Sequence, residues 1–264
     1  MLLSLEDLDV SFRNEDGDVT QAARDVSLTL ERGEVLGIVG ESGSGKSSVA
    51  MSIPRLLPSP PAFWPKGRIL FDGKDTLKMS VAELRRMRGS RIGVVFQDPM
   101  GSLSPLHRIG DQLVETVRLH RDVTAKAARE LALEWLGKVG IPEPAVRAQA
   151  YPHELSGGMQ QRVMIAMGLM LGPDLVIADE PTTALDVTIQ AQILKLMKAL
   201  HRANSAVLLI THDLGVVSQM ATRIAVMKDG RVVETSDRPD EFFDNPQHPY
   251  SRTLVGEARR MELQ

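Results

Sequence analysis

The chain contains no cysteine among its 264 residues. It therefore cannot form a disulfide, a thiolate metal site or an iron–sulfur cluster of its own. Its six histidines show no spacing typical of a metal cluster. No apolar run approaches the roughly 20 residues that a membrane-spanning helix needs, and no signal-like segment opens the sequence. These absences predict a cytosolic protein, or one that other subunits hold at a membrane.

An excess of basic residues is also missing. The 31 lysines and arginines face 34 acidic residues, which leaves a formal net charge of −3. This balance gives no reason to expect nucleic acid or an anionic membrane surface as a partner. The hydrophobic share of 43% and the charged share of 25% are ordinary for a globular protein. The length predicts one large α/β domain, or one such domain with a helical insertion.

A glycine-rich segment, GESGSGKSS at residues 40–48, matches the pattern G-x-x-x-x-G-K-[ST]. The apolar run Val35–Val39 before it is typical of a buried parallel strand. Residues 48–53 after it can begin a helix, which Pro54 would end. A strand, a glycine loop and the start of a helix form the context in which this pattern binds phosphate.

Each residue type in this loop has a physical reason. Glycines at positions 40, 43 and 45 allow positive φ and let backbone N–H groups approach an anion. Lys46 would reach the β- and γ-phosphates, and the Ser47 hydroxyl would bind Mg²⁺. The predicted nucleotide-binding residues of the loop are Gly40, Glu41, Ser42, Gly43, Ser44, Gly45, Lys46, Ser47 and Ser48.

A second motif is the segment LVIADE at residues 175–180, an apolar strand that ends in two carboxylates. Downstream of a phosphate loop, this pattern predicts that Asp179 holds Mg²⁺, directly or through water. Glu180 would polarise the attacking water as a general base.

A third motif, LSGGMQQR, occupies residues 155–162. Ser156 can cap a helix, and Gly157 and Gly158 in the first turn expose backbone N–H groups to an anion. Because these donors lie far along the chain from Lys46, we expect them to contact a phosphate held by another molecule.

Alternating apolar and polar residues predict two antiparallel strands, at residues 3–12 and 25–30, joined by a polar turn at 14–18. Apolar runs predict further strands at residues 67–71, 91–96, 175–178 and 206–210, and a closing hairpin over 223–235. The proline-rich stretch 56–65 is predicted to be an irregular loop.

From residue 111 to about residue 150 the hydrophobic period is helical. Thr124 can cap a helix whose apolar face would contain Ala128, Leu131, Trp135, Leu136 and Val139. A helical block between two strands of a parallel sheet indicates an inserted subdomain. A further helix, rich in methionine and leucine, is expected from residue 157 to residue 171.

LSGGMQQR between a phosphate loop and an acidic strand resembles the signature of ATP-binding cassette (ABC) ATPases. The resemblance implies that Gln97 senses Mg²⁺ and that His212 contacts the γ-phosphate. It implies that Asp186 lies in a loop crossing a dimer interface, although a helix N-cap explains Asp186 nearly as well. Phe12 stands where the family has an aromatic residue stacked on adenine, usually tyrosine.

The resemblance implies an α/β fold, the P-loop NTPase ABC cassette, with a mixed central sheet, flanking helices, an antiparallel β subdomain and an inserted helical subdomain. Residues 1–264 would form a single ABC ATPase domain. Within it, residues 1–96 and 172–240 would make the β subdomain and RecA-like core. Residues 97–171 would make the glutamine loop, the helical subdomain and the signature helix, and residues 241–264 a short C-terminal tail.

Further segments are similar to the cassettes of dipeptide, oligopeptide and nickel importers: FQDPM at 96–100, YPHE at 151–154, ADEPTTALDV at 178–187, THDLGVV at 211–217 and HPY at 248–250. The resemblance implies an ATPase, converting ATP and water to ADP and phosphate, that powers an importer of di- or oligopeptides. A nickel or metallophore importer is the alternative. A non-transport ABC ATPase of DNA repair or translation is a remote alternative, since the chain has one phosphate loop, no heptad run and no cysteine.

The same resemblance implies the partners. A second cassette, either a copy or a relative, would close head to tail with this one around two ATP molecules. Two membrane-spanning permease subunits would dock on residues 98–106 and the helix at 111–119, and an extracytoplasmic substrate-binding protein would act indirectly. No nucleic acid is expected. The protein would lie peripherally on the cytoplasmic face of the membrane.

Overall fold

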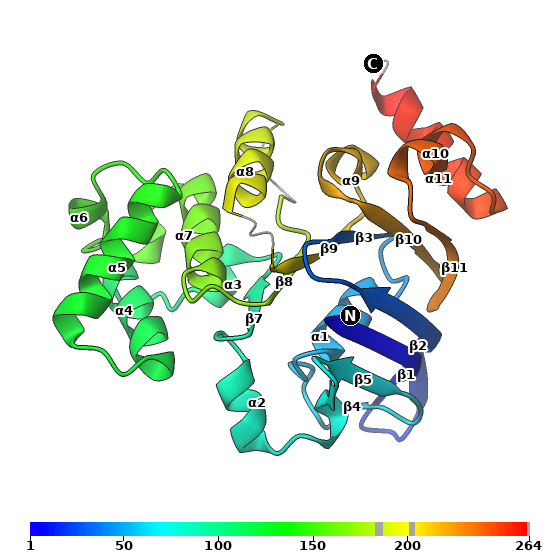
Figure 1. Cartoon of the computed structure of the whole chain (residues 1–264), viewed down its shortest axis with the longest axis horizontal. Helices are drawn as coiled ribbons and strands as arrows, with labels where there is room; N and C mark the ends of the chain where they lie inside the picture. The colour runs from blue at the N-terminus through cyan, green and yellow to red at the C-terminus, as the bar shows by residue number, and fades with distance from the viewer. Residues whose placement is uncertain (183–186, 201–203, 263–264) are drawn as a thin grey trace. The chain divides into compact units, whose positions relative to one another are not determined.

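The computed structural model describes residues 1–182, 187–200 and 204–262. The chain forms two compact units (Figure 1). The first contains Met1–Arg85 and Arg202–Gln264, and the second contains Arg86–His201. Among the described residues, none of the helices combines the length and the hydropathy that crossing a bilayer requires.

The first unit contains an antiparallel sheet around its first strand. Strand β1 (Leu3–Arg13) pairs with β2 (Val19–Leu30) and, on its other edge, with β5 (Arg68–Phe71), which turns back into β6 (Lys74–Asp75). The predicted strand at 25–30 thus begins earlier than expected, because β2 continues to Val19 beside the end of β1. Figure 1 shows β1, β2 and β5 side by side, coloured blue to cyan.

The prediction of an irregular loop over residues 56–65 is partly wrong. A two-residue strand, β4 (Ala62–Phe63), pairs with β1 inside this stretch. Ala62 is buried against the sheet, and the indole N–H of Trp64 donates to the Ser52 hydroxyl at 2.8 Å. The short pairing satisfies backbone groups at the edge of β1, which outweighs the low strand propensity of the prolines around it.

The first unit also contains strands of a second sheet, which is mixed. These strands run in the order β11 (Arg231–Ser236), β10 (Arg223–Lys228), β3 (Val35–Val39) and β9 (Ala206–Thr211). Strand β3 is parallel to both neighbours, and β10 and β11 form the predicted antiparallel hairpin. Every residue of β3 and β9 is buried, as expected for parallel strands covered on both faces.

The helices of the first unit include α1 (Lys46–Ser52), η1 (Thr76–Lys78), α9 (Leu214–Met220), α10 (Pro239–Asp244) and α11 (Pro249–Glu262). Helix α2 (Val81–Met87) contains the boundary with the second unit. One core cluster joins the end of β3 to α9, β10 and the two C-terminal helices; its buried residues are Val39, Leu214, Val217, Ile224, Val226, Phe242, Tyr250 and Val255.

The second unit combines two parallel strands, β7 (Ile92–Val95) and β8 (Leu175–Asp179), with the predicted helical block. Its helices are α3 (Pro99–Ser102), α4 (Ile109–His120), α5 (Ala125–Lys138), α6 (Pro144–Arg147), η2 (Pro152–Glu154), α7 (Gly157–Leu169) and α8 (Val187–Leu200). Helices α4, α5 and α7 pack on one another, and α7 also packs on β7.

The expected cap and face of α5 are largely as predicted. The Thr124 side chain accepts a hydrogen bond from the Ala127 N–H at 3.2 Å. Ala128, Trp135 and Leu136 are buried, but Leu131 is only half-buried and Ala132 takes the inner position. The period of 3.6 residues explains the difference, because position 132 lies one turn after 128 and one turn before 136.

Candidate nucleotide site

The phosphate loop leaves the carboxyl end of β3 and bends through three glycines with positive φ, at 151° for Gly40, 80° for Gly43 and 95° for Gly45. A Cβ at Gly40 would overlap the Met227 carbonyl oxygen, and one at Gly45 would overlap the Ala22 carbonyl oxygen. Positions 40 and 45 therefore require glycine for both conformation and space. At Gly43 a Cβ would meet nothing within 4 Å.

The Lys46 side chain lies inside this loop and is 4% exposed. Its ammonium donates to the carbonyl oxygens of Gly40 and Glu41, both at 2.7 Å, and to the Ser44 hydroxyl at 3.2 Å. Three oxygen acceptors thus keep a buried positive charge at the centre of the loop. Ser47, the other predicted phosphate-loop ligand, is exposed in the first turn of α1.

Neighbouring segments of the first unit hold the loop from outside. The Gly230 N–H, in the hairpin turn between β10 and β11, donates to the Ser44 carbonyl at 3.2 Å. The Glu41 N–H donates to the Tyr250 hydroxyl at 2.9 Å, which links the loop to helix α11. Both partners come from the C-terminal quarter of the chain.

His212, predicted to contact the γ-phosphate, lies beside the same strand end. Thr211, the last residue of β9, is paired with Val39, the last residue of β3. His212 follows directly and is exposed. Asp213 then caps α9, accepting from the Gly215 N–H at 2.8 Å, so that the backbone after His212 is fixed.

Phe12 lies near the end of β1, where it is half-buried. Its backbone pairs with Thr20 of β2 and with Ala62 of β4. The short strand β4 therefore helps to fix the segment that contains the predicted adenine-stacking residue.

In the second unit, the structure brings Gln97 and Glu180 together. Strands β7 and β8 are parallel, with Val95 opposite Ala178, so Gln97 and Glu180 both follow two residues later at the same edge. The Gln97 amide nitrogen donates to the Glu180 carboxylate at 3.1 Å. Asp179, the last residue of β8, is buried with 8% of its surface exposed.

Glu180 has a left-handed backbone conformation, with φ at 45°. This region is unfavourable for residues other than glycine, asparagine and aspartate, and such strain is concentrated at functional sites. A hydrogen bond fixes Pro181, the residue after Glu180: the Gln161 amide nitrogen donates to the Pro181 carbonyl at 2.6 Å. Gln161 is a buried residue of the signature helix that the motifs do not mark as a site residue. A polar side chain on the buried face of that helix is the feature that indicates it.

The signature helix α7 begins as predicted. The Ser156 side chain accepts a hydrogen bond from the Met159 N–H at 3.4 Å. A Cβ at Gly157 would meet nothing within 4 Å, whereas one at Gly158 would lie 3.1 Å from the Ile189 side chain. Gly157 is therefore the more accessible of the two glycines. Asp186 lies outside the described residues.

No group of three or more histidine, cysteine, aspartate or glutamate side chains suited to a metal occurs among the described residues. The predicted Mg²⁺ ligands are instead a hydroxyl, an amide and a carboxylate, from Ser47, Gln97 and Asp179. All three supply oxygen, which Mg²⁺ prefers, and one carboxylate with substrate phosphates is a usual magnesium environment. The hydrogen bond to Glu180 engages the nitrogen of Gln97, so its amide oxygen is the atom suited to a cation.

Comparison with known proteins identifies the family. The family model described as "ABC transporter" matches residues 23–183. The chain belongs to the ABC transporter family. The predicted cassette identity and ATPase activity are thereby confirmed, and the cassette binds ATP.

Two curated relatives resemble this cassette over nearly its whole length. It is 50% identical over 262 residues to the "Oligopeptide transport ATP-binding protein OppD" of Bacillus subtilis, covering 99% of this chain and 73% of that one. It is 51% identical over 263 residues to the "Dipeptide transport ATP-binding protein DppD" of the same organism, covering 99% and 78%.

Solved structures confirm the predicted fold. The dimeric, post-hydrolysis ATP-binding cassette MJ0796, bound to ADP and Pi, matches with a TM-score of 0.79 and 31% identity over 89% of this chain and 98% of that one. CbiO1 from Clostridium perfringens, part of the ABC transporter complex cbiONQ, matches with a TM-score of 0.74 and 29% identity, covering 99% and 98%.

Proposed function

We propose that this cassette hydrolyses ATP to power the import of di- or oligopeptides. The observation that carries the proposal is the identity of about half of all residues with oligopeptide and dipeptide transport cassettes, over 99% of the chain. A putative peptide import protein of Brucella abortus is 47% identical over 98% of the chain. A nickel or metallophore substrate is less favoured by these relatives. The family match disfavours a non-transport ATPase of DNA repair or translation.

The phosphate loop binds the nucleotide phosphates in this proposal. The buried Lys46 charge, already surrounded by three oxygen acceptors, exchanges some of them for phosphate oxygens. Backbone N–H groups of residues 40–48 provide the remaining donors. Phe12 stacks on the adenine, and His212 contacts the γ-phosphate.

The oxygen atoms of Ser47, Gln97 and Asp179 would hold Mg²⁺, which would supply positive charge close to the nucleotide phosphates. Glu180 accepts a proton from the attacking water, and the amide of Gln97 orients the Glu180 carboxylate through the 3.1 Å hydrogen bond.

A second cassette completes the site. The segment of the second cassette that corresponds to Ser156, Gly157 and Gly158 contacts the nucleotide bound by this chain. In the same way, these three residues of this chain contact the nucleotide bound by the second cassette. Asp186 lies in the loop that crosses the interface. The solved cassette MJ0796 is described as dimeric, which supports a paired arrangement. The pair is made of two copies or of two related cassettes.

The proposal includes a membrane-spanning partner on each cassette. The segment after β7 carries large apolar side chains in water: Phe96 is 37% exposed, Met100 69% and Leu106 81%. Three exposed apolar side chains within one short segment support an interaction site here, since interaction sites gather apolar side chains at the surface. Two permease subunits dock here and on α4, an extracytoplasmic binding protein delivers the peptide, and the cassette lies on the cytoplasmic face.

We also propose that residues 97–171 form the glutamine loop, the helical subdomain and the signature helix of a single ATPase domain. Residues 1–96 and 172–240 form its β subdomain and core in this view, and residues 241–264 its C-terminal tail.

Transport is tested with the complex that copurifies from gently solubilised membranes, after identification of its subunits by mass spectrometry and reconstitution in vesicles. Di- or oligopeptides with the cognate binding protein should stimulate ATP hydrolysis several-fold, and Ni²⁺ should not. The Glu180→Gln complex is the control for hydrolysis by this cassette. Stimulation by Ni²⁺ but not by peptides would contradict the substrate assignment.

The shared site is tested with Gly157→Asp. A carboxylate at the first position of α7 fits the open space there and interacts favourably with the helix dipole. It would repel the phosphates of the nucleotide bound by the partner cassette. ATP hydrolysis should be lost while ATP affinity of the isolated cassette is unchanged. Ala125→Asp, at the exposed first position of α5, is the matched control and should hydrolyse ATP normally. Equal activity of the two variants would rule out the shared site.

A further inference from the structure

Tyr250 lies in the HPY segment, at the second residue of helix α11, 209 positions along the chain from Glu41. It is outside the range matched by the family model and outside the predicted nucleotide site. Yet its hydroxyl accepts the Glu41 N–H at 2.9 Å, and Glu41 is the second residue of the phosphate loop. A residue of the C-terminal helix thus contacts the backbone of the nucleotide-binding loop.

The tyrosine ring is fixed in place by packing. Tyr250 is 7% exposed and belongs to the core cluster that includes Val39, the residue before the loop. The Lys228 ammonium lies over the ring, 4.8 Å from its centroid. Because the ring cannot turn away without opening this cluster, the hydroxyl is a preorganised partner for the Glu41 N–H.

The hydroxyl is also constant in charge. Burial is the largest cause that raises the pKa of Tyr250 above its ordinary value. The phenol therefore stays neutral at physiological pH, and the hydrogen bond to the loop does not change with pH in that range.

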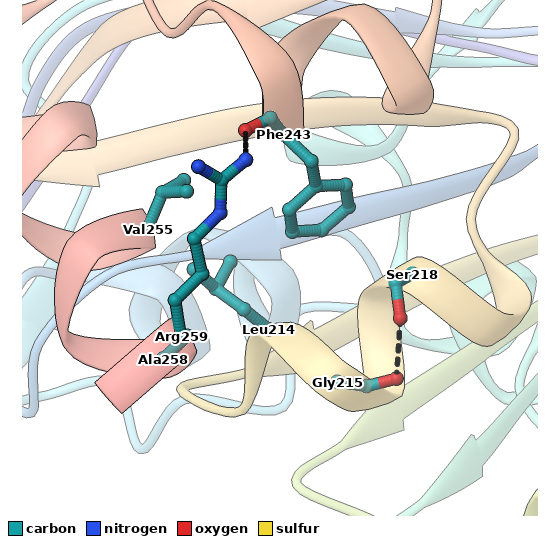
Figure 2. A pocket seen from close by; sticks show the side chains of 7 residues that line it. All are labelled: Leu214, Gly215, Ser218, Phe243, Val255, Ala258 and Arg259. Atoms are coloured by element: carbon teal, nitrogen blue, oxygen red, sulfur yellow. Dashed lines mark hydrogen bonds between the residues drawn. The ribbon is translucent and has the colours of Figure 1, made fainter. Parts of the chain in front are cut away.

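Helix α11 is anchored at its far end as well (Figure 2). The Arg259 guanidinium donates to the Phe243 carbonyl at 2.6 Å, and Val255 packs in the core cluster. A pocket of about 290 Å³ lies between α9 and α11, lined in part by Leu214 and Ala258. The position of Tyr250 is therefore set by helix α11. This helix contacts the phosphate loop through Tyr250 and lies beside α9.

We propose that Tyr250 is a positioning residue for the phosphate loop: its hydroxyl fixes the first turn of the loop and so raises nucleotide affinity. Without this acceptor, the Glu41 N–H turns to water and the turn between Gly40 and Gly43 samples more conformations. The nucleotide then has to order the turn on binding, which weakens affinity but leaves the bound reaction unchanged. This inference rests on the proposed role of residues 40–48 in phosphate binding.

The test compares Tyr250→Phe with Thr253→Val in the full chain. The first variant keeps the ring and removes only the hydroxyl. The second removes a hydroxyl from the exposed face of the same helix. Calorimetric titration with ADP should give a dissociation constant about two- to tenfold higher for Tyr250→Phe, the range expected for one hydrogen bond. Thr253→Val should match the wild type. ATP turnover should show a raised KM and an unchanged kcat for Tyr250→Phe.

A purely structural role is separated by Val255→Ala, which opens a cavity in the same cluster without touching the hydroxyl. This variant should lower the melting temperature more than Tyr250→Phe does and leave ADP affinity near the wild-type value. Amide hydrogen exchange supplies a direct readout, since the Glu41 amide should exchange faster in Tyr250→Phe only.

The outcomes are distinct. An unchanged ADP affinity in Tyr250→Phe, or an equal loss of ADP affinity in Val255→Ala, overturns the positioning role. As long as the wild-type chain binds ADP, the proposed function is unaffected by that result. Failure of the wild-type chain to bind ADP or ATP would instead remove the proposed function itself.

Discussion

Two turns follow buried parallel strands in this cassette, and they solve the same geometric problem differently. After β3, the chain bends with positive φ at three glycines, Gly40, Gly43 and Gly45. After β8, it bends with positive φ at a glutamate, Glu180. The first turn serves the backbone, because main-chain N–H groups have to approach an anion closely. The second turn serves a side chain, because a carboxylate has to project from the strand end.

The two turns differ in how much backbone strain remains in the folded state. In the phosphate loop, glycine adopts positive φ without backbone strain. At positions 40 and 45 no other residue fits, because a Cβ there would overlap a backbone carbonyl oxygen. Glu180 cannot be exchanged for glycine without losing its carboxylate, so the strain stays in the folded state. The hydrogen bonds from Gln97 to Glu180 and from Gln161 to Pro181 hold the strained turn.

The largest expected effect comes from the carboxylate. Glu180→Gln keeps the size of the side chain and removes the base, so kcat should fall by about 10²–10⁴-fold while ATP affinity is retained. Steady-state ATPase assays and equilibrium ATP binding measure the two quantities. Glu134→Gln, an exposed glutamate paired with Lys138, is the control and should be fully active. Wild-type turnover of Glu180→Gln would remove the base assignment.

The next effect tests the glycines. Gly43→Ala should lower the free energy of unfolding by about 1–2 kcal/mol, the cost of a left-handed alanine. Gly45→Ala has the same conformational cost and a Cβ that overlaps the Ala22 carbonyl, which should add about 1–3 kcal/mol. Urea unfolding and ATP binding compare the pair. Similar results for the two variants would mean that close approach of the backbone is not what position 45 requires.

A smaller effect is expected from Gln97→Leu, which removes the donor to Glu180. A hydrogen bond to a charged group contributes about 1.5–3 kcal/mol, so kcat should fall by about 10- to 150-fold. In the double variant Gln97→Leu/Glu180→Gln, Gln97→Leu should cost less than it does in the wild type, because a hydrogen bond to a neutral amide is weaker than one to a carboxylate. The loss that remains measures the proposed contact of the Gln97 oxygen with Mg²⁺. Fully additive losses would show that the hydrogen bond to the Glu180 carboxylate does not contribute to kcat.

The smallest effect concerns stability alone. Glu180→Gly and Glu180→Gln both remove the base, but only glycine relieves the left-handed strain. Allowing for the flexibility of unfolded glycine, Glu180→Gly should be more stable to urea by up to about 1 kcal/mol. A less stable Glu180→Gly chain would show that the turn after β8 does not store strain.

The sequence predicts the local features of this site well. Strand β3, the glycine loop, the Thr124 and Ser156 caps and the hairpin over residues 223–235 are all local, because each depends on residues that are neighbours in the sequence. The pairing of Gln97 with Glu180 depends on the register of two strands about 80 residues apart and was not predicted. Neither was the positive φ of Glu180, because no residue preference favours it there.

Contacts over long separations were the least predictable. The hydrogen bond from Glu41 to Tyr250 depends on the position of α11. That position in turn depends on packing of α11 with α9, β10 and α10. Strand β4 also depends on a distant segment, because its two residues form a strand only by pairing with the edge of β1. The predicted roles of Phe12, His212 and Asp186 stay predictions.

The open space at Gly157 also makes this chain a convenient object for labelling chemistry. Because the sequence has no cysteine, Gly157→Cys would introduce the only thiol in the protein. A Cβ there meets nothing within 4 Å, so a maleimide dye or spin label could be attached without repacking α7. Protection of that single thiol by added ATP would report directly when a second molecule covers the signature helix.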